Sequence, residues 1–253
     1  MTENTHSTTH NGFRKHSLAL ALATCFTTAF AASVTQAATW DVTITNLTNG
    51  NHFTPLLVTA HSHDINLFEL GMSASPALEA MAECGDLAPL LATTDVGGED
   101  DDTIANPASG LLAPGTSTTT MLDTTEDHLS IVSMLLPTND AFLGLNSQHI
   151  PAAAGTYTYF VNAYDAGTEV NYEVLSTSEG CATDDTVGMI PMAPVINPGM
   201  NGTGLATMEN NTMIHVHRGV LGDQDASGGN SDLNSTIHRW QNPVAKITVT
   251  VTP

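Results

Sequence analysis

The stretch Trp40-Asp41-Val42-Thr43-Ile44-Thr45 alternates apolar and polar side chains without a break. Because successive side chains of a β-strand point to opposite faces of a sheet, this period predicts a strand with one buried face. A similar alternation fills residues 244–252. Further strand-like runs cover Leu56–His61, Thr116–Leu122, Leu129–Leu136, Tyr157–Ala163 and Thr212–Arg218.

Helical signals are few. Ser75 followed by Pro76 is typical of a helix start, Gly85 of a helix end, and a second short turn is expected over Leu87–Ala92. Cys181–Thr212 is rich in Pro and Gly and is expected to be a long loop. The sequence therefore predicts an all-β protein, an antiparallel β-sandwich of about eight strands with one or two short helices and long loops.

The N-terminus has the features of a targeting segment. Arg14 and Lys15 precede a mostly apolar run, Ser17–Phe30, and small residues surround Ala37. The run is shorter than the roughly 20 residues of a transmembrane helix. We expect a signal peptide over residues 1–37, cleavage at Ala37 and one exported domain over 38–253. Its location would be periplasmic, cell-surface or extracellular, with no transmembrane segment.

Composition limits the partners. The chain has 26 Asp and Glu residues against five Lys and Arg, a formal net charge of −21. Such a surface repels nucleic acid and attracts cations, although solubility alone also accounts for many of the charges. We therefore expect a divalent cation, and not nucleic acid, among the partners.

Two cysteines, Cys84 and Cys181, follow the targeting segment. In an oxidising compartment an even pair forms one disulfide most simply. On the loop-entropy model, such a bridge stabilises a fold by roughly 3–5 kcal/mol.

Two compact acidic turns follow apolar runs. One contains Asp140, and the other, Tyr164–Asn171, contains Asp165, Glu169 and Asn171. Asp and Asn side chains also serve ordinary turn chemistry by bonding their own backbone. Ca²⁺, however, binds six to eight oxygens from carboxylates, amides and carbonyls. If loops at one end of the sandwich meet, the two turns provide such oxygens.

Paired histidines offer an alternative metal site. His61 and His63, and likewise His215 and His217, are two residues apart and so share one face of an extended strand. Imidazole suits Cu or Zn, and four nitrogens would converge if the two strands were neighbours. This alternative describes an exported copper- or zinc-binding protein.

Motifs for catalysis are absent from the sequence. It has no GxSxG, HExxH or P-loop pattern. Asp165 and Glu169 are both carboxylates, but their spacing on one turn leaves no cleft for a glycosidase substrate. We expect a protein that is not an enzyme.

Five segments, in this order, carry a resemblance to a known family. They are Asn46–Pro55, Leu129–Asp140, Tyr164–Glu169, His215–Gly219 and Trp240–Ala245. Together they resemble the spondin N-terminal domain in a bacterial secreted form, and they span nearly the whole chain after residue 37.

The resemblance implies an extracellular β-sandwich, and animal members are matrix proteins involved in cell adhesion. The partners of the animal members do not transfer to this chain, and we expect a binding or adhesion role with a cell-surface or matrix component as a partner. It also implies a metal ion in end loops, and residue by residue this site falls on Asp140, Asp165 and Glu169. Animal members often have Asp at the position of Glu169, which leaves ion preference open. We expect Ca²⁺, with Asn171 as a further oxygen donor.

Overall fold

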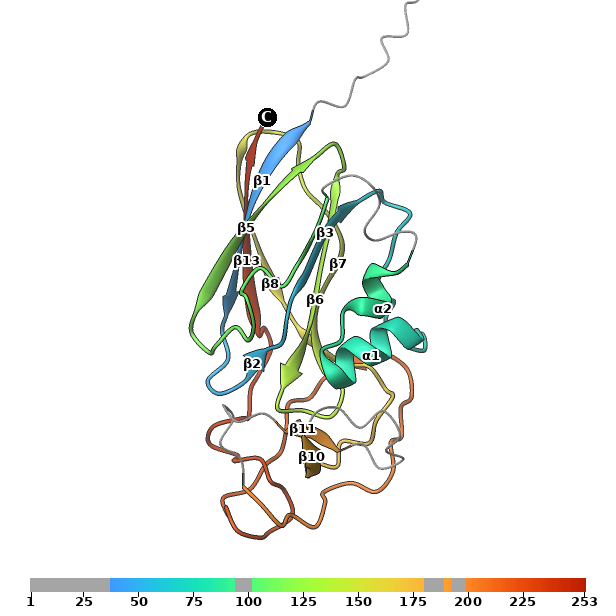
Figure 1. The fold of residues 1–253 in the computed structure, drawn as a ribbon, viewed down its shortest axis with the longest axis vertical. Coiled ribbons are helices and arrows are strands. Elements are labelled where there is room, and N and C mark those ends of the chain that lie inside the picture. The colour runs from blue at the N-terminus through green and yellow to red at the C-terminus, as the bar shows by residue number, and fades with distance from the viewer. Residues whose placement is uncertain (1–36, 94–101, 180–188, 193–198) are drawn as a thin grey trace, which may run out of the picture. The chain divides into compact units, whose positions relative to one another are not determined.

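Two antiparallel β-sheets face each other in the computed structural model, which describes residues 37–93, 102–179, 189–192 and 199–253 (Figure 1). The strand order of the four-stranded sheet is β5 (Ser117–Thr124), β1 (Ala38–Asn46), β13 (Ala245–Thr252), β8 (Gly155–Val161). Trp40, Val42 and Ile44 of β1 are buried, as their alternation predicts.

The second sheet has seven strands. Its order is β12 (His215–Val216), β9 (Ala163–Asp165), β7 (Ala141–His149), β6 (His128–Leu136), β3 (Leu57–His61), β4 (Thr103–Ala105), and β2 (His52–Phe53) pairs with the far end of β6. A separate parallel pair joins β10 (Leu175–Glu179) to β11 (Ile190–Met192).

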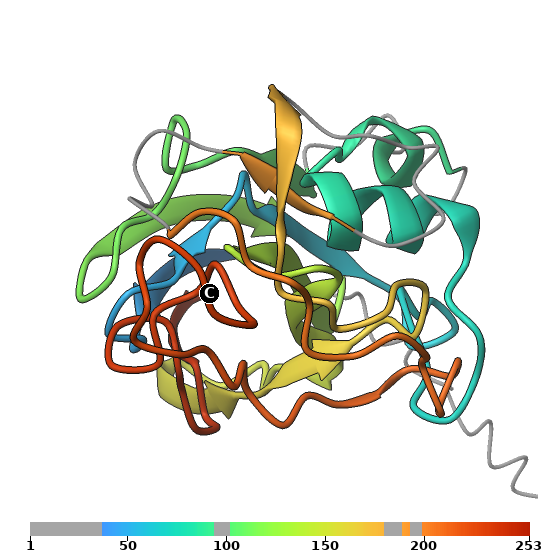
Figure 2. The ribbon, with the colours of Figure 1, turned by 90° about the horizontal axis from the view of Figure 1, so that it is seen from below.

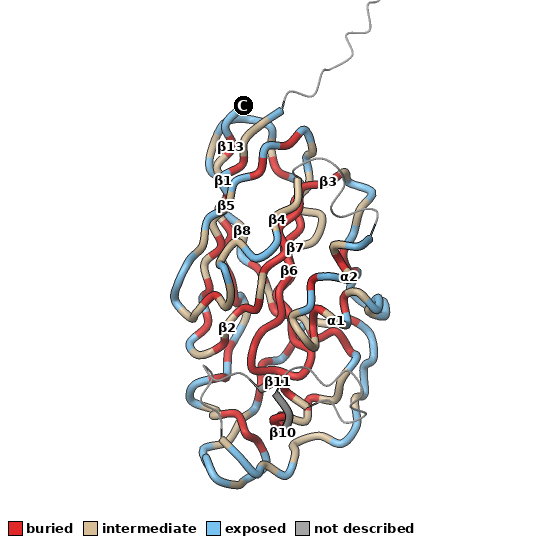
Figure 3. The backbone as a smooth tube through the Cα atoms, in the orientation of Figure 1, coloured by how far each residue is buried: buried red, intermediate tan, exposed pale blue. Residues whose placement is uncertain are grey.

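Strand β6 lies at the centre of the core. Every residue of β6 after His128 is buried (Figure 3). It is hydrogen-bonded to β3 on one side and β7 on the other, and the helix α1 packs on it. A strand that is buried on both faces is mostly apolar, as Leu129–Leu136 is apart from Ser130 and Ser133.

The two helices follow their sequence signals. Helix α1 (Pro76–Cys84) is capped by Ser75, whose Oγ accepts a hydrogen bond from the backbone N–H of Leu78 at 3.1 Å. It ends at Gly85, where φ is +65°, a value that favours glycine. A short helix, α2 (Ala88–Leu91), follows. The helix predictions are therefore confirmed.

Strand β7 was not among the predicted strands. Its sequence is interrupted by Gly144, which weakens a strand signal. The structure shows the reason for glycine, because a Cβ there would lie 2.5 Å from the ring of Phe68. The ring of Phe68 therefore packs against the backbone of β7, where any larger residue would displace it.

The sandwich class is confirmed, with more strands than predicted. Thirteen strands are present in the described residues. The additional ones are mostly of two to five residues, too short for periodicity to reveal: β2, β4, β9, β10 and β11. The predicted strand Thr212–Arg218 is reduced to the two residues of β12.

Buried carboxylates stabilise the loop-rich end of the protein. Figure 2 shows this end from below, with the loops of residues 199–242 crossing it. Glu173 is 1% exposed and accepts hydrogen bonds from the backbone N–H of Leu221 (2.7 Å) and Gly222 (2.8 Å) and from Ser231 Oγ (2.8 Å). Asp232 accepts from the N–H groups of Leu175 and Gly202. These carboxylates replace the strand pairing that the loops lack.

We predict that Glu173→Gln lowers the free energy of unfolding by roughly 2–4 kcal/mol, because an amide cannot accept from all three buried donors. Urea unfolding measures the loss. The matched control is Glu69→Gln, at an exposed position, where the change should stay within about 0.5 kcal/mol. Equal stabilities for the two variants would contradict this role of Glu173.

Candidate metal centre

The two predicted acidic turns meet at one end of the seven-stranded sheet. Asp140 directly precedes β7, and Asp165 ends β9. The two strands pair, with Ala141 opposite Asp165, and the N–H of Ala166 donates to the carbonyl of Asp140 at 3.3 Å. The proximity that the sequence argument required is therefore present.

Asp140 is fully buried and only half satisfied. Its Oδ2 accepts from the backbone N–H of Thr168 (2.9 Å) and of Glu169 (3.2 Å) and from Thr168 Oγ1 (3.3 Å). Its Oδ1 is buried and has no hydrogen-bond partner. Such an atom is costly unless a proton or a cation meets it.

Gly167 makes this wrapping possible. Its φ is +71°, and a Cβ at this position would lie 2.6 Å from the backbone of Thr212. The turn can therefore fold tightly enough to aim two consecutive N–H groups at Asp140 only with glycine here.

Burial, and then the neighbouring carboxylate of Asp165, raise the pKa of Asp140 to about 8. The pKa of Asp165 is also raised, chiefly by burial, against the hydrogen bond from Asn171. Two carboxyl groups this close resist carrying two negative charges. Near neutral pH, the pair holds a proton or attracts a positive ion.

Asp165 connects the acidic turns to the second histidine pair. Its Oδ2 accepts from Asn171 Nδ2 at 2.8 Å and lies 3.7 Å from Nε2 of both His215 and His217. Its Oδ1 accepts from the N–H of Gly167 at 2.9 Å. The sequence predicts the acids and these histidines as alternative sites, whereas the structure brings Asp165, His215 and His217 into one cluster.

His217 is a neutral, fully engaged imidazole. The N–H of Gly219 donates to its Nδ1 at 2.9 Å, so the proton is on Nε2, which donates to Asn171 Oδ1 at 3.0 Å. Burial and the nearby Arg218 lower its pKa to about 3. His217 therefore forms no ion pair with Asp165 near neutral pH and positions Asn171 instead.

His215 differs from His217 in the neighbour of its Nε2 atom. Its Nδ1 lies 2.8 Å from the carbonyl of Met213, which can only accept, so Nδ1 carries a proton. Nε2 then faces Asp165, and the side chain is 31% exposed. This ring connects the buried cluster to solvent.

Two acidic neighbours were missed by the sequence argument. Glu83 of α1 raises the pKa of Asp140, and Glu209 raises that of Asp165. Glu209 Oε2 also accepts from Asn171 Nδ2 at 3.4 Å. Neither residue belongs to a turn motif, and only the tertiary fold brings them close.

The remaining predicted ligands are placed as follows. Glu169 contributes its backbone N–H to Asp140, and its side chain is half-buried. Asn171 is committed to Asp165 and His217 through its own amide. In the described parts of the chain, no group of three or more His, Cys, Asp and Glu side chains is arranged to hold a metal ion. The oxygens of Asp140 and Asp165 nevertheless fit a hard cation in charge and donor type.

The two histidine pairs do not converge. His61 ends β3, whose neighbours are β4 and β6, whereas His215 begins β12, whose neighbour is β9. The condition for a shared four-nitrogen site therefore fails.

Other predicted positions are only partly within the described residues. Cys84 ends α1, but Cys181 lies outside them, so the disulfide stays a prediction. Residues 1–36 of the predicted signal peptide also lie outside, and the predicted cleavage residue Ala37 directly precedes β1.

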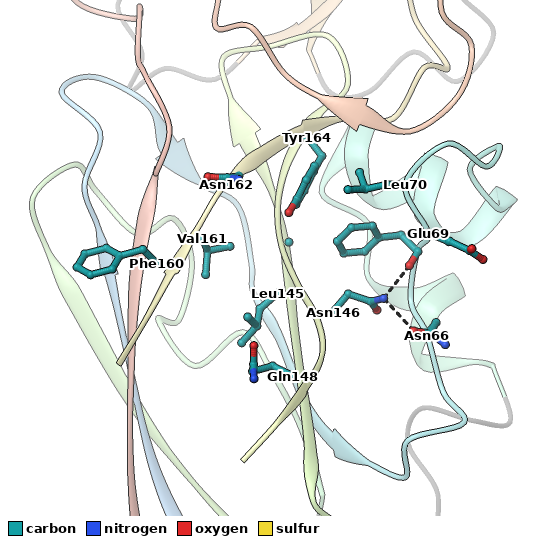
Figure 4. A pocket seen from close by; sticks show the side chains of 12 residues that line it. Asn66, Glu69, Leu70, Leu145, Asn146, Gln148, Phe160, Val161, Asn162 and Tyr164 are labelled. Carbon is teal, nitrogen blue, oxygen red and sulfur yellow. Dashed lines mark hydrogen bonds between the residues drawn. The ribbon is translucent and has the colours of Figure 1, made fainter. Parts of the chain in front are cut away.

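An open pocket of about 610 Å³ lies beside β7 and β8 (Figure 4). Its lining combines amide side chains, such as Asn66 and Asn146, with the rings of Phe160 and Tyr164. The amide of Asn146 donates to Asn66 Oδ1 and to the carbonyl of Phe68, so it is engaged within the protein. The pocket thus shows no set of converging catalytic groups.

The free energy of unfolding of the cation-free protein should fall as pH rises from about 4 to about 8. Folded Asp140 keeps its proton up to a pKa of about 8, whereas an unfolded Asp ionises near pH 4, so the folded state binds more protons in this window. Urea unfolding in a chelator at several pH values measures the slope. Asp140→Asn should flatten it, and exposed Asp41→Asn should not. A parental slope in Asp140→Asn would contradict the assignment.

His217 should produce the opposite trend at lower pH. Its folded pKa is about 3 and its unfolded value about 6.5, so the unfolded chain binds the extra proton and stability falls as pH drops through this window. His217→Gln should remove this loss in the same unfolding series, while His63→Gln, at an exposed position, serves as the control. An imidazole NMR signal of His217 that titrates near pH 6.5 would refute the neutral assignment.

Comparison with known proteins supports the motif-based reading. No helix in the described part of the chain has the length and apolar character needed to cross a membrane. No curated protein matches the chain. The family model described as Spondin_N, a family of non-enzymatic, extracellular-type domains, matches residues 41–195. Because this match covers more than half of the 253 residues, the chain belongs to the Spondin_N family.

Proposed function

We propose that this protein is an exported, non-enzymatic binding or adhesion-type domain whose loop end is held together by a divalent cation, Ca²⁺. Family membership supports the general class. The observation that carries the cation is the buried Oδ1 of Asp140, which has no hydrogen-bond partner and has Asp165 as its charged neighbour.

Asp140 and Asp165 are the direct charged ligands in this proposal. Their Oδ2 atoms already accept protein hydrogen bonds, but a carboxylate oxygen has more than one acceptor site. The half-buried carboxylate of Glu169 lies on the same turn and supplies the third predicted ligand. Asn171 contributes by a turn of its amide, and carbonyl oxygens and waters complete the six to eight ligands of Ca²⁺.

The donor types favour a hard ion. The candidate ligand atoms of Asp140, Asp165 and Glu169 are carboxylate oxygens, and the ring nitrogens of His217 are both engaged. Glu83 and Glu209 add negative charge around the pair. A doubly charged cation offsets this repulsion where a single shared proton offsets only part of it.

The cation has a structural role in this scheme. The turn after β9 wraps Asp140, and β12 lies against Asp165. Neutralising the two carboxylates fixes both segments against the sheet end. The neighbouring loops then form a rigid, acidic surface for a cell-surface or matrix component.

Ca²⁺ should raise the melting temperature of the untagged, chelator-treated protein by roughly 5–10 °C at a hundredfold excess over Kd. This follows from about 2.7 kcal/mol of linked stability and about 2–4 °C per kcal/mol for a domain of this size. Differential scanning calorimetry measures the shift.

Asp140→Asn separates a cation site from a merely structural carboxylate. Without Ca²⁺ at pH 8 it should be at least as stable as the parent, because the repulsion is gone, yet it should lose the Ca²⁺ response. Asp225→Asn, an exposed acid outside the cluster, should keep the full response. A full response in Asp140→Asn would reject the site.

A further inference from the structure

A row of histidines crosses the other end of the seven-stranded sheet. His61 of β3 pairs with His128 of β6, which pairs with His149 of β7, and His63 lies just beyond β3. Strand β6 runs nine residues from His128 to Leu136, so this row is on the order of 25 Å from the carboxylate cluster. It is a separate feature, and His128 and His149 played no part in the sequence argument.

His61 is the structural member of the row. It is 3% exposed, its Nδ1 lies 2.8 Å from the carbonyl of Ser62, and its Nε2 lies 2.7 Å from Ser130 Oγ. Burial lowers its pKa. With both nitrogens engaged, His61 is unavailable to a ligand.

His128 is held in an orientation suited to metal binding. Its Nδ1 is 2.7 Å from Asp127 Oδ1, and because a carboxylate accepts, Nδ1 carries the proton. The lone pair is then on Nε2. A carboxylate that fixes one imidazole nitrogen while the other binds metal is the usual arrangement around metal-ligating histidines. The side chain is 15% exposed, enough for an ion to reach it.

Two exposed histidines stand next to His128. The ring centroid of His149 is 5.4 Å and that of His63 is 6.2 Å from the centroid of His128. Two imidazoles on one Zn²⁺, with Zn–N distances of about 2.0–2.1 Å, have centroids roughly 5–6 Å apart. Each exposed ring therefore lies close to the range of a shared ion with His128, although the described residues do not yet form a three-ligand arrangement and both exposed side chains must turn.

We propose that His63, His128 and His149 form a site for a divalent transition-metal ion of the Zn²⁺, Ni²⁺ and Cu²⁺ class, with Asp127 as a positioning residue. His128 is the fixed ligand, and the exposed side chains of His63 and His149 turn toward it when the ion binds. His63 gives up its surface contact with Asp64, 3.0 Å from Nε2 and well exposed, at little cost.

The local charge favours a cation at this place. Asp64 and Asp127 each contact one of the histidines, and Glu126 is close enough to affect the pKa of His61. A ligand set of imidazoles selects borderline transition metals, whereas Ca²⁺ requires oxygen donors. This site and the carboxylate cluster should therefore bind different ions.

The test is a Zn²⁺ titration of untagged protein at pH 7.5 in the presence of Ca²⁺, against a chromophoric chelator. We expect one Zn²⁺ per chain with micromolar affinity. The double variant His63→Ala/His149→Ala should weaken binding at least a hundredfold with an unchanged Ca²⁺ response. His215→Ala, at the opposite end of the sheet, is the control and should bind Zn²⁺ as the parent does.

Asp127→Ala, which removes the acceptor, tests the positioning role. It should weaken Zn²⁺ binding about 10–100-fold, and ¹⁵N NMR should show that His128 no longer keeps its proton on Nδ1, a change that a merely structural effect would not produce. Undiminished Zn²⁺ binding by the double variant overturns the proposal. Loss of binding in His215→Ala overturns it as well, because it would place the ion at the carboxylate cluster.

Discussion

The buried carboxyl group is the constraint on which the loop-rich end of this protein depends. Asp140, Asp165, Glu173 and Asp232 all accept hydrogen bonds from backbone N–H groups, and all four are buried. Ionised carboxylates make the strongest such bonds. Burial and the neighbouring Asp165 raise the pKa of Asp140, and burial raises that of Asp165, so these two groups favour the neutral form instead. The turns around this pair are thus held by groups whose charge must be offset, and we have proposed a cation for that role.

The two ends of the seven-stranded sheet carry different side chains, and the length of the strands keeps these groups apart. One end gathers carboxylates around Asp140, with two imidazoles beside Asp165, and the other gathers imidazoles around His128. The middle of the sheet is occupied by the apolar residues of β6, which transmit no charge. The sandwich therefore keeps the two ion sites that we have proposed apart in one small domain.

Much of this fold could be predicted from local signals. The alternation around Trp40, the cap at Ser75 and the glycine at Gly85 each act through neighbouring residues, and each prediction is confirmed. Strand β7 escaped prediction because Gly144 is explained only by Phe68, which lies far away in the sequence.

The part of the candidate site that lies on turns could be predicted, because turn signals come from neighbouring residues in the sequence. Asp140 and Asp165 follow apolar runs, and strand pairing then places them together. Glu83 comes from a helix and Glu209 from a long loop, so no spacing in the sequence connects them to the cluster. The histidines were misjudged for a related reason. Spacing of two identifies a shared strand face, but only the strand order shows that His61 lies beside His128 and far from His215.

The contact between Trp240 and His217 has a practical consequence. Their ring centroids are 5.0 Å apart, and Trp240 is 6% exposed. The other tryptophan, Trp40, belongs to the core of the four-stranded sheet. An indole packed on an imidazole senses the ring's charge and orientation through its fluorescence. The domain therefore carries a natural optical probe at its loop end and an internal reference in its body, so changes in the cluster can be followed without any label.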